Sequence, residues 1–195
     1  MPESNNQNFN HLKIHTQYSI CEGAIKIEKL KDFCKENKIP CLGLSDTSNL
    51  FGALEFAENI SKVGTQPIIG TQIYFKFEDT TGLLPLIALN QKGYKRIIEL
   101  SSKSYLENDA LSDPHLDIRE LLTKTDGVLL LSGTIQGLFG KLFEKGRLEE
   151  ISKIYKDLSL ILNDNFYLEI QRHGDQNETA FEKFNLEQSS KNKIP

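Results

Sequence analysis

Histidine and lysine alternate near the start of the chain, in the stretch His11-Leu12-Lys13-Ile14-His15. In an extended strand, alternate residues point to the same side, so both imidazoles and the ammonium group would face one pocket. Alternating histidines at the end of a strand are a typical platform for a metal ion. Two histidines at this spacing are also compatible with ordinary polar positions, so the pattern alone does not define a metal site.

Two further segments with the pattern of strands end in polar residues that suit metal or phosphate chemistry. The apolar stretch at 42–45 leads into Asp46, and the stretch at 166–170 leads into a polar cluster that contains His173. In barrels of alternating strands and helices, catalytic residues collect at the C-terminal ends of the strands. We therefore expect Asp46 and His173 at the same rim. The alternatives are a helix cap for Asp46 or Asn49 and an ordinary loop position for His173.

Short apolar runs alternate with longer amphipathic stretches, the pattern of strand–helix units around a parallel sheet or barrel. This alternation predicts an α/β fold with 107–115 as its most loop-like segment. After an alternating run at 9–18, the expected strands cover 41–44, 67–77, 84–89, 128–131, 158–162 and 166–170. The expected helices cover 24–37, 52–63, 92–106, 117–124, 138–157 and 177–190.

The tetrapeptide Asn-Lys-Ile-Pro occurs twice, at 37–40 and at 192–195. The first copy ends an expected helix and opens an expected strand, so the second copy predicts a further strand after Pro195. A barrel that lacked this strand would keep an unpaired edge. We therefore expect a flexible tail over 1–8 and one domain over 9–195, cut before that strand. Chance repetition of a short Lys/Asn/Ile-rich sequence is the alternative.

The composition is that of one globular domain and excludes several classes of protein. The 195 residues carry 23 Lys and Arg against 27 Asp and Glu, a net charge of −4, whereas domains that bind DNA on their own show a basic excess. The longest apolar run, at 83–89, is far shorter than the ~18 residues of a membrane span. The three cysteines lack the spacing of a zinc ribbon. Because the first ten residues lack the pattern of a secretion signal, we expect a cytoplasmic location.

Six segments carry a resemblance to a known family: HLKIHTQYSICEGA, LGLSDTSNLFGALEF, PIIGTQIY, ALNQKGYKRIIELSSKSY, GVLLLSG and FYLEIQRHG. Their order and spacing resemble the N-terminal PHP (polymerase and histidinol phosphatase) domain of bacterial DNA polymerase III alpha subunits, from Phe9 to about Pro195. The resemblance implies a distorted (β/α)7 PHP barrel, here incomplete at its C-terminal end. In active family members, two or three metal ions at the strand ends support phosphoesterase or proofreading exonuclease chemistry.

The sequence departs from the family pattern at most of its metal-ligand positions. Lys13 stands in place of a histidine, Gln72 in place of a glutamate, and Thr47 in place of the histidine of an Asp-His pair. At three further ligand positions, Glu22 replaces an aspartate, Leu83 replaces a histidine and Thr134 replaces a cysteine. The nine positions that the resemblance assigns to this site are Lys13, His15, Glu22, Asp46, Thr47, Gln72, Leu83, Thr134 and His173. A last motif, Asp-x-His, would lie beyond Pro195.

These replacements predict a vestigial site that holds no metal ion and has no catalytic residue. Lys13 puts a positive charge where a neutral ligand should be, and it would repel a metal ion. Leu83 has no donor atom, and Gln72 offers only a neutral carbonyl oxygen, so too few carboxylates remain for several divalent ions. We expect the Lys13 ammonium to pair with Asp46, Glu22 or both, in place of the lost cations. A lysine that extends into solvent is the alternative.

The resemblance implies a structural and partner-binding module of a DNA-directed DNA polymerase, the nucleotidyltransferase of bacterial DNA replication. We expect the fragment itself to be catalytically inactive and to contact the remainder of the alpha subunit and, in some members, the proofreading exonuclease subunit. Contact with DNA would be indirect, through the full-length protein, and no membrane partner is expected. The alternative is a metal-dependent phosphoesterase or 3'–5' exonuclease that keeps a reduced Zn, Mn or Mg site on His15, Asp46 and His173. A short standalone homologue is a third interpretation.

Overall fold

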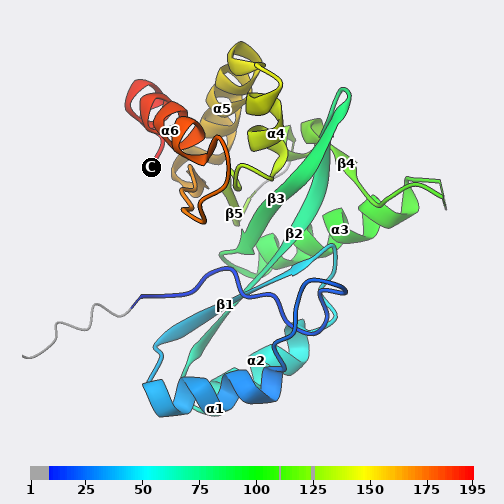
Figure 1. Cartoon of the computed structure of the whole chain (residues 1–195). Helices are drawn as coiled ribbons and strands as arrows, with labels where there is room; N and C mark the ends of the chain where they lie inside the picture. Colours follow the sequence, from blue (N-terminus) through cyan, green and yellow to red (C-terminus); the bar gives the residue numbers. More distant parts are fainter. Residues whose placement is uncertain (1–8, 110, 124–125) are drawn as a thin grey trace, which may run out of the picture.

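The computed structural model describes residues 9–109, 111–123 and 126–195 as a mixed α/β fold with one six-stranded sheet (Figure 1). The flexible tail predicted for residues 1–8 lies outside the described residues. The strands are β1 (Cys41–Thr47), β2 (Gln66–Phe77), β3 (Thr80–Ala88), β4 (Leu116–Asp117), β5 (Val128–Leu131) and β6 (Phe166–Tyr167). The helices are α1 (Ile27–Asn37), α2 (Ala53–Ser61), α3 (Gln91–Leu106), α4 (Leu138–Glu144), α5 (Leu148–Leu162) and α6 (Glu178–Asn192), with 3-10 turns η1 (Ile118–Leu122) and η2 (Asn163–Asn165).

The sheet follows the order β1-β2-β3-β5-β6, and β4 pairs with the C-terminal end of β2. Neighbouring strands are parallel except at β3, which runs antiparallel to both β2 and β5. The prediction of a parallel sheet is therefore wrong for β3. The reason is the turn at Glu78 and Asp79, which joins Phe77 directly to its partner Thr80 without a crossover helix. Glu78 has φ 51°, the left-handed backbone conformation that two-residue hairpin turns need.

Several other predicted elements differ from the structure, and the strand predicted over 166–170 is reduced to the two residues of β6 (Phe166–Tyr167). Residues 158–162, predicted as a strand, form the end of α5, because Leu158 and Leu162 continue the buried stripe of this helix at helical spacing. The single helix predicted over 138–157 is divided into α4 and α5 near Gly146, which has φ 74°. The helix predicted over 117–124 is reduced to the 3-10 turn η1.

Residues 11–16 lie along β1 but make only isolated bridges instead of a regular strand. The backbone N–H of Ile14 donates to the Gly43 carbonyl at 3.0 Å, and the N–H of Ser45 donates to the Ile14 carbonyl at 2.9 Å. Glycine is required at position 43, because a Cβ there would lie 2.4 Å from the carbonyl oxygen of Leu12. The N-terminal segment is thereby fixed at the outer edge of β1.

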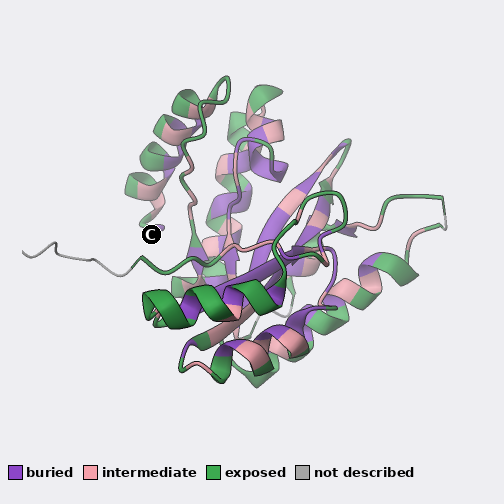
Figure 2. Ribbon diagram, turned by 60° about the horizontal axis from the view of Figure 1, so that its bottom comes forward, coloured by how far each residue is buried: buried purple, intermediate pink, exposed green. Residues whose placement is uncertain are grey.

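Two apolar clusters hold the helices on the sheet. The smaller cluster joins α1, β1 and α2, and the larger one packs β2, β3 and β5 against α3, α4, α5 and α6. Figure 1 shows α1 and α2 together at the bottom of the molecule, and α4, α5 and α6 at the top. In Figure 2 the strands are largely buried, whereas the outward faces of the helices are exposed. Across the described ranges, no helix combines the length and the apolar character needed to cross a membrane.

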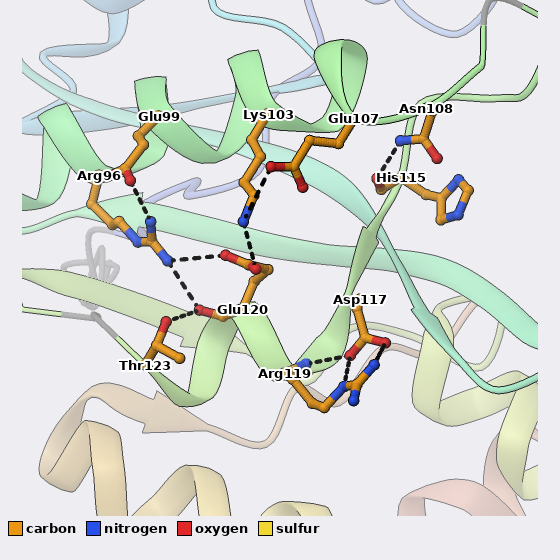
Figure 3. A network of polar contacts seen from close by, with 10 residues as sticks. All are labelled: Arg96, Glu99, Lys103, Glu107, Asn108, His115, Asp117, Arg119, Glu120 and Thr123. Atoms are coloured by element: carbon orange, nitrogen blue, oxygen red, sulfur yellow. Dashed lines mark hydrogen bonds and ion pairs between the residues drawn. The ribbon is translucent and has the colours of Figure 1, made fainter.

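A network of charged groups fixes η1 against α3 (Figure 3). The Glu120 carboxylate binds Lys103 at 2.6 Å and Arg96 at 3.7 Å, and Arg96 also donates to the Glu120 carbonyl at 3.0 Å. The Asn108 side chain donates to the His115 carbonyl at 2.7 Å. The segment predicted as a loop over 107–115 is therefore held at both of its ends.

The two Asn-Lys-Ile-Pro copies have the same local structure. The lysine of each copy caps a helix in the left-handed conformation, with φ 51° in the first copy and 54° in the second. The proline carbonyl of the first copy accepts a hydrogen bond from Gln66 N at 2.9 Å, and that of the second accepts one from Leu168 N at 2.8 Å. Each copy therefore brings its chain alongside a neighbouring strand or its extension. The strand expected after Pro195 stays a prediction.

We predict that Gly93→Ala destabilises the fold. Gly93 lies in the first turn of α3, where a Cβ would come within 1.7 Å of the Gly127 carbonyl oxygen. Helix propensity alone favours alanine by up to about 1 kcal/mol, whereas overpacking costs about 1–3 kcal/mol. Urea unfolding should show a net loss of unfolding free energy. The control is Ser102→Ala, at an exposed position of the same helix. A Gly93→Ala variant as stable as the wild type would contradict this close approach.

Candidate functional site

A cavity of about 1010 Å³ collects most of the positions singled out in the sequence. Seven of the nine predicted positions line it, although they come from widely separated parts of the chain: Lys13, His15, Glu22, Gln72, Leu83, Thr134 and His173. Thr47 is not in its lining but is one hydrogen bond away from Gln72. Asp46 is also outside the lining and is fully buried.

Lys13 forms an ion pair with Glu169, with 2.7 Å between Nζ and Oε1. Both side chains are largely buried, with exposed fractions of 17% and 11%. Gln171 donates to the same Glu169 oxygen, and the backbone N–H of Glu169 donates to Ser132 Oγ at 2.9 Å. The ion pair connects the segment beside β1 to the segment that follows β6, which lie at opposite ends of the strand order.

Glu169 therefore corrects the sequence prediction, which paired Lys13 with Asp46 or Glu22. The oxygens of those two carboxylates accept hydrogen bonds from neighbouring hydroxyl groups instead. The alternative of a lysine extended into solvent is also wrong, because the Lys13 side chain is mostly covered. Sequence reasoning missed Glu169 although it lies in the quoted segment FYLEIQRHG. A covered lysine requires a carboxylate partner, and Glu169 is the acidic residue of the strand predicted over 166–170.

Asp46 holds the N-terminal segment on the end of β1. Its carboxylate accepts three hydrogen bonds: from Thr16 N at 2.6 Å, from Thr16 Oγ1 at 2.7 Å and from Ser19 Oγ at 2.8 Å. Ser19 Oγ in turn accepts a hydrogen bond from Thr47 N at 3.0 Å. Both carboxylate oxygens are thus used to order residues 16–19, a structural role for this predicted ligand position.

Glu22, Thr47 and Gln72 form a chain of hydrogen bonds at one side of the cavity. Gln72 Nε2 donates to Thr47 Oγ1 at 2.8 Å, and Thr47 Oγ1 donates to a Glu22 carboxylate oxygen. Thr47 and Gln72 face each other in the pairing of β1 with β2, which explains their contact. In this chain of contacts, neutral donors stabilise the Glu22 carboxylate.

His15 is the half-buried imidazole of the cavity. Burial lowers the pKa of His15 below its ordinary value of 6.5, and nearby Lys13 acts in the same direction, whereas Glu22 and Asp46 oppose the shift. Nδ1 of His15 is buried and has no hydrogen-bond partner within the described part of the chain. A neutral imidazole in this position can serve as an acceptor or as a donor, depending on its tautomer.

The other predicted positions contribute less to a common centre. His11 does not line the cavity and packs edge-on against Phe9, with 4.9 Å between the ring centroids, because the segment is not a regular strand. His173 lines the cavity but is exposed, and its backbone N–H is bound by the Glu178 carboxylate. The sequence reasoning did not find several polar lining residues: Tyr74, Gln136, Lys141, Glu144, Gln171 and Asp175.

The donor set of the cavity does not fit a cluster of metal ions. Within residues 9–109, 111–123 and 126–195, no group of three or more His, Cys, Asp or Glu side chains is arranged to hold one. The Asp46 oxygens are already bonded to Thr16 and Ser19, and the Lys13 ammonium is fixed at the same cavity. Multinuclear divalent sites need several carboxylate or imidazole donors gathered around each ion, and the described residues that line the cavity form no such group. No reaction step through a metal ion follows from this geometry.

The structure is a mixed α/β fold with one six-stranded sheet, and the model of the PHP domain family matches residues 11–173. The chain belongs to the PHP domain family. It is also similar to DNA polymerase III alpha subunits, with 35% identity over 93% of the chain for the Caulobacter vibrioides protein and 37% over 85% for that of Rickettsia felis. The family predicted from the sequence is thus confirmed.

The chain spans only 17% and 14% of the lengths of these two relatives. Among solved structures, it is similar to a candidate metal-dependent phosphoesterase from Bifidobacterium adolescentis, with a TM-score of 0.63. That match covers 95% of this chain and 84% of the other at 12% sequence identity, so it supports the fold alone.

We predict that Asp46→Asn lowers the free energy of unfolding by about 2–3 kcal/mol, because one of the two oxygens that accept hydrogen bonds becomes a donor. The residues that lose their acceptor are Thr16 or Ser19. Chemical denaturation should be compared with Asp32→Asn on the exposed face of α1, which should change stability by less than about 0.5 kcal/mol. Equal effects of the two substitutions would rule out the proposed role of Asp46.

A pH-dependent stability follows from the lowered pKa of His15. Above the ordinary pKa of 6.5, the imidazole is neutral in both the folded and the unfolded state. As the pH falls, the unfolded state binds the proton first, so the stability that depends on neutral His15 is lost. His15→Gln should therefore reduce the loss of stability between about pH 7 and pH 5, measured by urea unfolding at each pH. A steeper loss in the variant would contradict the direction of the shift.

Proposed function

We propose that the chain is the PHP domain of a DNA polymerase III alpha subunit, with a degenerate metal site and a structural, partner-binding role. The observation that carries this proposal is the Lys13–Glu169 ion pair at the cavity lined by most of the positions that the family resemblance assigns to a metal site. It supplies a fixed positive charge and its counter-charge from the chain itself. The cavity then persists as part of the fold without hydrolytic chemistry.

Charge compensation explains how such a cavity remains stable. A carboxylate removed from water is costly unless a cation or several donors stabilise it. Glu169 is neutralised by Lys13 and the buried Asp46 is stabilised by Thr16 and Ser19, whereas Glu22 is exposed to water and also accepts a hydrogen bond from Thr47. Each of these carboxylates thus has a partner that does not depend on a bound metal ion.

The role of the domain follows from its place in a longer polymerase. The relatives that it matches are DNA polymerase III alpha subunits, of which it spans 14–17%, so DNA synthesis would depend on other parts of the polypeptide. We assign the six-stranded sheet to a distorted (β/α)7 barrel. We also assign packing against the remainder of the alpha subunit, and contact with the proofreading exonuclease subunit, as the functions of this module.

A reduced phosphoesterase site is the second candidate function, and one observation favours it. Nδ1 of His15 is buried, faces no hydrogen-bond partner among the described residues and is a potential metal ligand. The other two residues of that site are less suited, because Asp46 is saturated by three donors and His173 is exposed. The structural role is therefore consistent with more residues of the site than the phosphoesterase role is.

Metal content separates the two candidates. The protein, purified in the presence of Zn²⁺ and Mn²⁺ and then desalted, should hold well below one ion per chain and should not hydrolyse a generic phosphoester. Elemental analysis and a p-nitrophenyl phosphate assay provide the measurements. The matched control is Lys13→His, which restores the family residue at that position and removes the repelling charge. About one ion per wild-type chain, lost in His15→Ala together with hydrolysis, would support the phosphoesterase instead.

A further inference from the structure

A second concave surface lies away from the cavity and shares no lining residue with it. This groove, of about 440 Å³, lies between the start of α2, the start of β2, the end of β3 and the start of α3. Twelve residues line it and none of them is charged, although 26% of the chain is Asp, Glu, Lys or Arg. Depletion of charge is typical of the core of a protein interface rather than of a surface in water.

Large apolar side chains flank the groove on both sides. Leu54 on α2 is 71% exposed and Leu89 after β3 is 47% exposed, and both line the groove. Single exposed apolar residues are ordinary, but a group around a concave uncharged surface marks an interaction site.

The pairing of the strands explains why the groove exists. The ladder between β2 and β3 ends at the pair Gly70 and Ile87. The part of β2 that precedes Gly70 pairs only with β1, and the chain that follows β3 turns away to begin α3. The two strands diverge there and leave a gap. Pro67 lies in this gap and has no N–H, so the gap is unsuited to an added strand. The groove instead fits apolar side chains.

We propose that this groove seats an uncharged, apolar segment of the polymerase alpha polypeptide from outside these 195 residues. This inference rests on the proposed function and specifies the surface that the module uses. Since the chain spans 14–17% of the alpha subunits that it matches, most of such a polypeptide lies outside it. A segment of the same polypeptide docks at high effective concentration, so a groove of this size suffices without the larger interface that a separate subunit requires.

Hydrogen exchange on the full-length polypeptide tests this inference and identifies the segment. In Leu54→Glu, a charge is placed on the groove while the exposed position leaves the fold intact. Peptides over 53–57 and 89–94, and one peptide from outside residues 1–195, should exchange about tenfold faster than in the wild type. Phe33→Glu, an exposed apolar position on α1, is the matched control and should change none of these peptides.

Each other outcome overturns the inference. The first is that exchange outside residues 1–195 is unchanged in both Leu54→Glu and Leu89→Glu. The second is that the groove is protected only when the exonuclease subunit is added or when the polypeptide self-associates. The third is a reading frame that ends at residue 195. Peptides of α1 and β1 that exchange as in the wild type show that a variant is folded. Metal content and hydrolysis, measured on the same wild-type sample, report separately on the proposed function. Unchanged exchange in the full-length polypeptide therefore leaves that proposal standing, whereas a reading frame that ends at residue 195 would overturn both.

Discussion

The ion pair between Lys13 and Glu169 is the interaction on which the arrangement of this site depends. The two residues are 156 positions apart in the sequence and connect the segments at opposite ends of the strand order. Because both side chains are largely covered, neither charge is left to bulk water, and the loss of one partner exposes the other to the full cost of an unpaired charge. The N-terminal segment and the chain after β6 are thereby held at one cavity.

Asp46 completes this arrangement from the interior. Its carboxylate orders Thr16 and Ser19, so the N-terminal segment reaches the end of β1 with Lys13 and His15 directed to the cavity. The same residue types that could bind metal ions are used here for contacts within the chain. Together with the Lys13–Glu169 ion pair, these contacts connect the segments at the two ends of the sheet.

The sequence predicted the family, because motif order and spacing carry that information, and seven of the nine positions assigned to the site line one cavity. It did not predict Glu169 as the partner of Lys13, since a long-range ion pair leaves no local pattern. The direction of β3 was missed because apolar alternation reports a strand but not the neighbour with which it pairs. Residues 158–162 were assigned to a strand because a short apolar run is the same in a buried strand and in the last turns of a buried helix.

A double-mutant cycle on Lys13 and Glu169 tests the central claim most directly. Lys13→Met keeps the length of the side chain and Glu169→Gln keeps its shape, so each single variant removes one charge with little change in packing. We predict that each single variant loses about 2–4 kcal/mol of unfolding free energy and that the double variant loses no more than either, which corresponds to a coupling energy of at least about 2 kcal/mol. Additive effects, with a coupling energy within about 0.5 kcal/mol of zero, would contradict the claim that this ion pair holds the site together.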